Sequence, residues 1–169
     1  MASRLVVLLA ALALPATACG TSAPAPAASA DPALVASYLS LADKFEADYA
    51  TAAANFKQRS IGADDFGASR QLYSDLALAY LNFANAALDL KWQGAAADEA
   101  NSLGKGILAL ARQLDQMSRW DITQFASYEK RVEAGNDDVK KLVDPVRKDV
   151  ATLSADLGLP SPRPEIPTG

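Results

Sequence analysis

The side chains that could do chemistry in this sequence are few, and their spacing argues against a catalytic set. Histidine is absent from all 169 residues, which removes the commonest acid–base group near neutral pH and the commonest metal ligand. Two acidic pairs, Asp64-Asp65 and Asp137-Asp138, have the chemistry to bind a hard cation or to exchange a proton. Both pairs lie at expected helix starts, where carboxylates accept hydrogen bonds from free backbone N–H groups. We therefore interpret them as helix caps.

The remaining nucleophile arrangements also fail to form a complete set. Ser102-Leu103-Gly104-Lys105 resembles, in letters only, the nucleophile motif of penicillin-recognising enzymes, whose Lys-Thr-Gly motif does not occur here. Without histidine, Ser-His and Cys-His nucleophiles and the Glu-x-x-His ligands of di-iron bundles are excluded. We expect a protein that is not an enzyme and that uses no cofactor and no metal.

The single cysteine, Cys19, follows a segment with the pattern of a signal peptide, residues 1–18. Arg4 provides a positive start, and an unbroken apolar run, Leu5–Leu14, follows it and ends at Pro15. The run is shorter than the roughly 20 residues that a permanent membrane-spanning helix needs. This pattern predicts export, with cleavage before Cys19.

Ala16-Thr17-Ala18-Cys19 resembles the lipobox of bacterial lipoproteins. The resemblance covers residues 1–19 only. It implies that the Cys19 thiol carries a diacylglyceryl group, whose two acyl chains are fatty acids such as palmitate, and that this group anchors the protein to the extracytoplasmic face of the cell membrane. Ala16-Thr17-Ala18 also fits ordinary secretion, which would leave Cys19 unmodified.

Small, uncharged and Pro-containing residues follow the cysteine, so residues 19–30 are expected to form a flexible linker. In an extended polyproline II form, the linker would hold the next domain roughly 30 Å from the membrane. The net charge of the chain is −4, so a nucleic-acid partner is not expected.

Residues 31–158 show helical periodicity throughout and predict an all-α, up-and-down antiparallel four-helix bundle. Asp31-Pro32 predicts the first helix start, and Gly158 with Pro160 predicts the last helix end. A kink or split of the last helix is expected near 135–145, where Gly135-Asn136-Asp137-Asp138 and Asp144-Pro145 occur. Residues 159–169 are Pro-rich and are predicted to be disordered or to form polyproline II.

Two functions remain open for this bundle. The first is a non-enzymatic interaction module of the cell envelope that binds an unidentified envelope protein or other component. The alternative is a carrier of lipid or of a small apolar ligand in the bundle interior. In the carrier hypothesis Gly104 and Gly106 open space between helices, and Tyr80, Phe83 and Tyr128 form its walls. A filled core with an exposed apolar patch would favour the interaction module.

Overall fold

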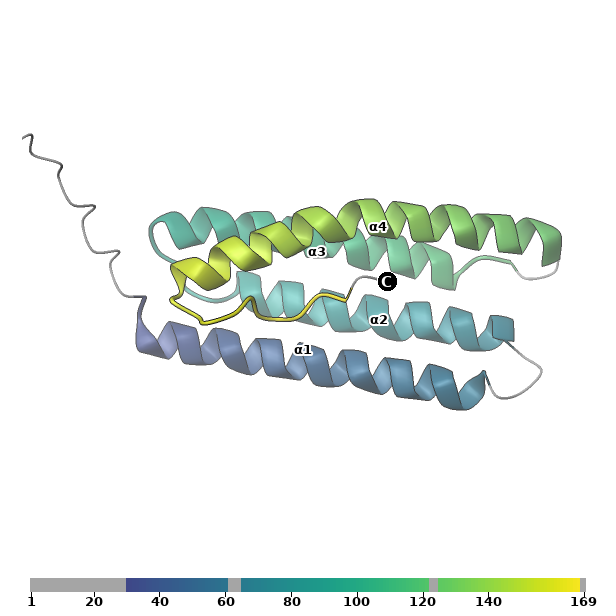
Figure 1. Cartoon of the computed structure of the whole chain (residues 1–169), viewed down its shortest axis with the longest axis horizontal. Coiled ribbons are helices and arrows are strands. Elements are labelled where there is room, and N and C mark those ends of the chain that lie inside the picture. Colours follow the sequence, from purple (N-terminus) through teal and green to yellow (C-terminus); the bar gives the residue numbers. More distant parts are fainter. Residues whose placement is uncertain (1–29, 61–64, 122–124, 168–169) are drawn as a thin grey trace, which may run out of the picture.

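The computed structural model describes residues 30–60, 65–121 and 125–167. The expected signal peptide, Cys19 and the linker up to Ser29 therefore lie outside the described residues. The four helices are α1 (Pro32–Arg59), α2 (Asp65–Leu88), α3 (Ala95–Ser118) and α4 (Phe125–Asp156), and no strand occurs within the described ranges. Consecutive helices pack side by side and run in opposite directions (Figure 1). The predicted all-α, up-and-down bundle is confirmed.

Local sequence signals set the first and last helix ends. The carboxylate of Asp31 accepts a hydrogen bond from the Ala33 N–H at 2.9 Å, and Pro32 occupies the first turn of α1, as the sequence predicts. Gly158, with φ of 71°, follows α4, and Leu159 N–H donates to the Ser154 carbonyl at 2.9 Å. This is a Schellman-type end, which needs the left-handed backbone that glycine adopts most easily.

Helix α4 is continuous from Phe125 to Asp156, with Pro145 inside it. Figure 1 shows its axis changing direction partway along, so that its yellow C-terminal part slopes towards α1 and α2. Of the two expected forms, kinked or split, the helix takes the bent one. Asp137 and Asp138 therefore lie inside a helix, and their predicted role as caps is wrong.

The four helices do not close into a ring. Packing runs from α1 to α2, from α2 to α3 and from α3 to α4, whereas α1 and α4 have no Cα atoms within 8 Å of each other among the described residues. The segment that follows α4, residues 157–167, turns back and lies in the seam between them (Figure 1). We call residues 157–167 the tail.

The tail differs from the disordered segment predicted for residues 159–169. Pro164 is fully buried, and Ile166 is only 5% exposed and belongs to the hydrophobic core. The Arg147 guanidinium of α4 donates from Nε to the Ile166 carbonyl at 2.7 Å. Prolines are common in disordered chains. Here the side chains of Pro164 and Ile166 are buried in the open seam, and the Ile166 carbonyl accepts a hydrogen bond, so this Pro-rich segment is held in place.

The core is filled by side chains from all four helices and from the tail. Aromatic rings come from α1 and α2, whereas α3 and α4 contribute mainly aliphatic groups. The largest fully buried side chains are Tyr38, Phe45, Leu103, Ile107, Leu110, Met117, Val146, Val150, Leu153, Ser154 and Pro164. Their burial supplies the main stabilising free energy of the bundle.

Candidate functional site

The aromatic residues predicted to wall a ligand space fall into two separate clusters. Tyr80 and Phe83 are buried against Phe45, with ring centroids 4.9 and 5.4 Å from the Phe45 centroid. Tyr128 is buried near the end where α2 and α4 begin, and its ring lies 4.8 Å from that of Phe66. The structure therefore does not bring Tyr80, Phe83 and Tyr128 together into one site.

The two glycines of α3 allow close contact between helices. A Cβ atom at Gly104 would lie 2.6 Å from Leu88 Cδ2 of α2, and one at Gly106 would lie 2.9 Å from Val146 Cγ2 of α4. Both distances are shorter than real carbon contacts, so neighbouring side chains already occupy the space that the glycines leave. Helix packing explains Gly104 and Gly106, and they open no space for a ligand.

The other candidate groups lie on the surface in ordinary polar contacts. Ser102 Oγ donates to Asp149 Oδ2 at 2.8 Å, so this serine is engaged by a carboxylate of α4 rather than by Lys105. Asp138 pairs with Lys141 at 2.9 Å in an exposed ion pair. Within the described ranges, no group of three or more carboxylate, histidine or cysteine side chains is placed to hold a metal ion.

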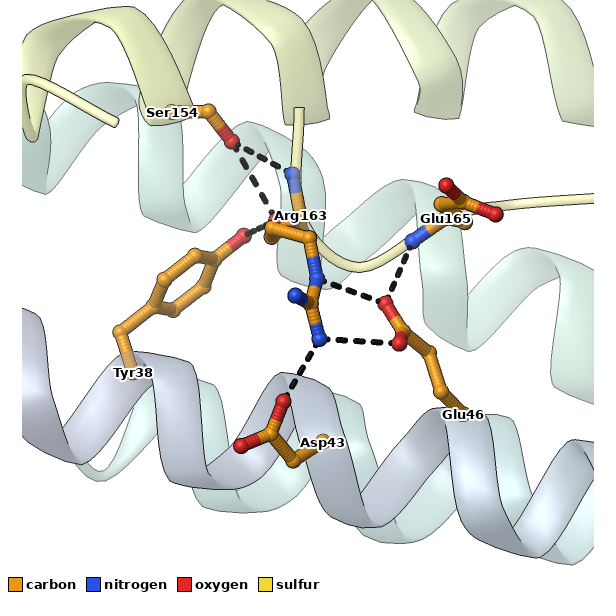
Figure 2. Close-up of polar contacts among 6 residues, drawn as sticks. All are labelled: Tyr38, Asp43, Glu46, Ser154, Arg163 and Glu165. Carbon is orange, nitrogen blue, oxygen red and sulfur yellow. Dashed lines mark hydrogen bonds and ion pairs between the residues drawn. The ribbon is translucent and has the colours of Figure 1, made fainter. Parts of the chain in front are cut away.

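The densest polar cluster joins the tail to α1 and α4 (Figure 2). Arg163 Nε and Nη2 donate to Glu46 Oε1 and Oε2 at 2.8 and 2.9 Å, and Nη2 also donates to Asp43 Oδ1 at 2.6 Å. The Glu165 N–H adds a further bond to Glu46 Oε1 at 3.0 Å. A planar guanidinium that meets a carboxylate with two parallel bonds is held in one orientation.

The backbone of Arg163 is held as firmly as its side chain. Its N–H donates to Ser154 Oγ at 2.9 Å, and its carbonyl accepts from the hydroxyls of Tyr38 and Ser154. Burial raises the pKa of Tyr38 well above its ordinary value, so the phenol keeps the proton that it donates. We call these contacts of Arg163 with Tyr38, Asp43, Glu46 and Ser154 the tail clamp. They hold the tail in one position against α1 and α4, which is a structural role.

The feature that stands apart from this packing is the solvent-facing side of α2. Leu78 is 57% exposed and Leu81 is 41% exposed, and they are the large hydrophobic residues that the described surface exposes. A hollow of about 360 Å³ lies beside them between α2 and α3, with Ala77, Leu108 and Ala111 in its lining. A second hollow, of about 330 Å³, lies on the other side of Leu78, towards α1.

Charged side chains border this side of α2, since Arg112 and Asp115 line one hollow and Lys44, Asp48 and Asp75 line the other, but the segment of α2 between them is uncharged. Ser74, Asn82 and Asn85 are exposed around the two leucines, and no Asp, Glu, Lys or Arg occurs in residues 76–88. We call the exposed residues Ser74, Leu78, Leu81, Asn82 and Asn85 the α2 face. Interface centres are depleted in charged residues in the same way, so the α2 face is the candidate interaction surface.

Sequence reasoning missed this surface although the signal was present. Leu76, Tyr80, Phe83 and Ala87 form the inward stripe of α2 at helical spacing, and all four are buried. Leu78 and Leu81 fall outside that stripe, and two leucines on the outer side of an uncharged helix segment should have indicated an exposed apolar surface.

Comparison with known proteins adds no relatives. No protein-family model matches the chain, and neither the curated proteins nor the solved structures give a significant match. None of the helices in the described part of the chain is both long and apolar enough to cross a membrane.

Proposed function

We propose that this chain is a membrane-anchored extracytoplasmic lipoprotein, and that its bundle is a non-enzymatic module that binds another component of the cell envelope. The lipobox-like Ala16-Thr17-Ala18-Cys19 supports the anchor. The observation that carries the binding role is the α2 face, where Leu78 and Leu81 are exposed above a filled core. Exposed leucines on a helix segment without charged residues lose contact with water when a partner covers them, and this favours association.

The alternative function, a carrier of lipid or apolar ligand in the bundle interior, has less support. It needs space between the helices near Gly104 and Gly106, and Leu88 and Val146 fill that space. It also needs Tyr80 and Tyr128 in one wall, and these two residues lie in different clusters. The α2 face is open to solvent and needs no rearrangement of the core.

The anchor is tested by replacing the one cysteine. In bacterial cells fed with labelled palmitate, the native chain is expected to take up the label and to fractionate with membranes. The Cys19→Ser variant is expected to take up none and to leave the membrane fraction. Equal behaviour of the two chains would contradict the anchor and would favour plain secretion.

The binding role is tested by placing a charge on the α2 face. Proteins in contact with the full chain are captured by chemical cross-linking in intact cells, for the native chain and for Leu78→Glu. The matched control is Ala151→Glu, which adds the same charge at an exposed position of α4. Loss of cross-linked products in Leu78→Glu but not in Ala151→Glu is the expected result, and an unchanged pattern in both would contradict binding through this face.

A further inference from the structure

The exposed positions of α2 follow a heptad pattern. Ser74, Leu78, Leu81 and Asn85 succeed one another at alternating steps of four and three residues, and all four are exposed. The next position of the series, Leu88, is half-buried and packs against Gly104 of α3, so the exposed series ends at Asn85. Alternating steps of four and three bring residues to one seam of a helix, the seam along which two helices pack in a coiled coil. The inward stripe of α2 serves the bundle core, so this second seam has no partner within the described chain.

The polar residue in this seam indicates what kind of partner fits. With Leu78 and Asn85 seven residues apart, both occupy the same heptad position, and Leu81 occupies the other apolar position. An asparagine at such a position pairs with an asparagine of a second, parallel helix and fixes the register of two strands. Side chains of both charge signs flank this seam, with Arg112 and Asp115 in one neighbouring hollow and Lys44, Asp48 and Asp75 in the other.

From these observations we propose that the α2 face binds the α2 face of a second copy of this chain, with the two helices parallel about a two-fold axis. This inference rests on the proposed function and names the partner. Leu78 and Leu81 then contact their own counterparts, and Asn85 pairs with Asn85. A two-fold contact needs a surface that is complementary to itself, and an uncharged seam of leucines and asparagine meets that condition.

The shape of the surface agrees with such a contact. Helix α2 forms a ridge with a hollow of about 360 Å³ on the α3 side and one of about 330 Å³ on the α1 side. Ridges of one helix pack into the grooves beside another. In a pair of copies, the side chains that flank one ridge enter the hollows beside the other, so ridge and groove are both present on one surface.

The direction of the chain agrees with a parallel arrangement. The start of α1, where the linker joins the domain, lies at the same end of the bundle as the end of α2 (Figure 1). Two copies with parallel α2 helices present both of these ends to the same side, so both anchors can reach one membrane. An antiparallel pair would place them on opposite sides. Tethering to one membrane also raises the local concentration of a weak pair.

The experiment is disulfide cross-linking of the full chain in native membranes. The test variant is Asn85→Cys, which leaves Leu78 and Leu81 in place, and the matched control is Ala151→Cys at an exposed position of α4. In a parallel pair, residue 85 faces its own copy. In an antiparallel pair centred between Leu78 and Leu81, the two copies of residue 85 would be roughly 16 Å apart, too far for a disulfide. The chain without an added cysteine measures any background from Cys19.

We expect a cross-linked dimer with Asn85→Cys on mild oxidation and only background with Ala151→Cys. Adding Leu78→Glu to Asn85→Cys should reduce the dimer about tenfold, because like charges then face each other across the seam. Circular dichroism checks that Leu78→Glu leaves the helices folded.

Equal cross-linking at both positions, or none above background at residue 85, would overturn the proposal. If the dimer is absent but Leu78→Glu still abolishes chemical cross-links to a different envelope protein, the second copy is wrong as partner while the binding role stands. If neither effect is seen, both proposals fail.

Discussion

The guanidinium of Arg163 and the carboxylate of Glu46 meet edge to edge through two hydrogen bonds of 2.8 and 2.9 Å. These residues are 117 positions apart in the sequence, one in the tail and the other in α1. Because α1 and α4 have no Cα atoms within 8 Å of each other in the described residues, this contact of the tail helps to connect the two sides of the open seam.

The Arg163→Ala substitution should lower the free energy of unfolding by about 1–3 kcal/mol, because Glu46 and Asp43 lose a charged donor and the tail is released. Urea denaturation followed by circular dichroism measures the loss. The control is Lys44→Ala, which removes an exposed ion pair with Asp48 and should change stability by less than about 0.5 kcal/mol. Equal effects of the two substitutions would contradict the role of the tail clamp.

Ile166 should contribute to stability as a core residue although it lies in a Pro-rich tail. It is 5% exposed and packs in the core cluster, so Ile166→Ala should cost about 2–4 kcal/mol through lost burial and the cavity left behind. The exposed neighbour Glu165 provides the control, since Glu165→Ala should cost less than about 0.5 kcal/mol. If Ile166→Ala were as mild as Glu165→Ala in thermal denaturation, the tail would not be docked in solution.

Gly104→Ala should destabilise the bundle despite the higher helix propensity of alanine. The new methyl group would meet Leu88 Cδ2 at 2.6 Å and Cγ at 2.7 Å, and overpacking of this kind costs about 1–3 kcal/mol, against a gain of about 1 kcal/mol from propensity. Adding Leu88→Ala to Gly104→Ala should remove the clash, so the two substitutions together should cost less than the sum of their separate effects. Strict additivity in this double-mutant cycle would show that the two groups do not meet.

Stability should fall at alkaline pH because of buried phenols. Burial raises the pKa of Tyr80 above its ordinary value of 10, and neighbouring Tyr49 adds to the rise. The folded state then holds the proton more tightly than the unfolded chain. This contribution to the free energy of unfolding is fully present below about pH 10 and is lost as pH rises towards the folded pKa.

Above pH 10, each phenol with a raised pKa lowers the free energy of unfolding by about 1.4 kcal/mol per pH unit. Tyr80→Phe should reduce the alkaline slope by that amount and leave the slope near pH 7 unchanged. Urea denaturation at several pH values between neutral and alkaline measures both slopes. An unchanged alkaline slope in Tyr80→Phe would show that this phenol ionises as readily in the folded chain as in the unfolded one.

Sequence periodicity was enough to predict the bundle, because each helix turns a regular apolar stripe inward. Asp31, Pro32 and Gly158 also marked helix ends correctly, since caps depend on local chemistry. Gly94 has the positive φ that glycine adopts easily, but it directly precedes α3, while α2 ends earlier, at Leu88. A local sequence pattern can predict that a glycine has a positive φ, but it cannot predict which helix lies next to that glycine.

Features that depend on distant partners could not be predicted from the sequence. Pro164 and Ile166 are buried only because α1 and α4 are held apart, which no local pattern in the tail reveals. In the same way, the sequence around Gly104 suggests empty space beside the third helix, and only the folded structure shows that the Leu88 side chain occupies it. The α2 face was within reach of periodicity, because its leucines lie outside the inward stripe.

The position of the tail clamp constrains the order in which the chain can fold. The hydroxyl of Tyr38 donates a hydrogen bond to the carbonyl of Arg163, 125 residues away, so the seam between α1 and α4 cannot close until the tail has been synthesised. A partly synthesised chain can pair its early helices but must leave one side of its core open to water. The core of this domain is therefore completed only after all four helices and the tail have been synthesised.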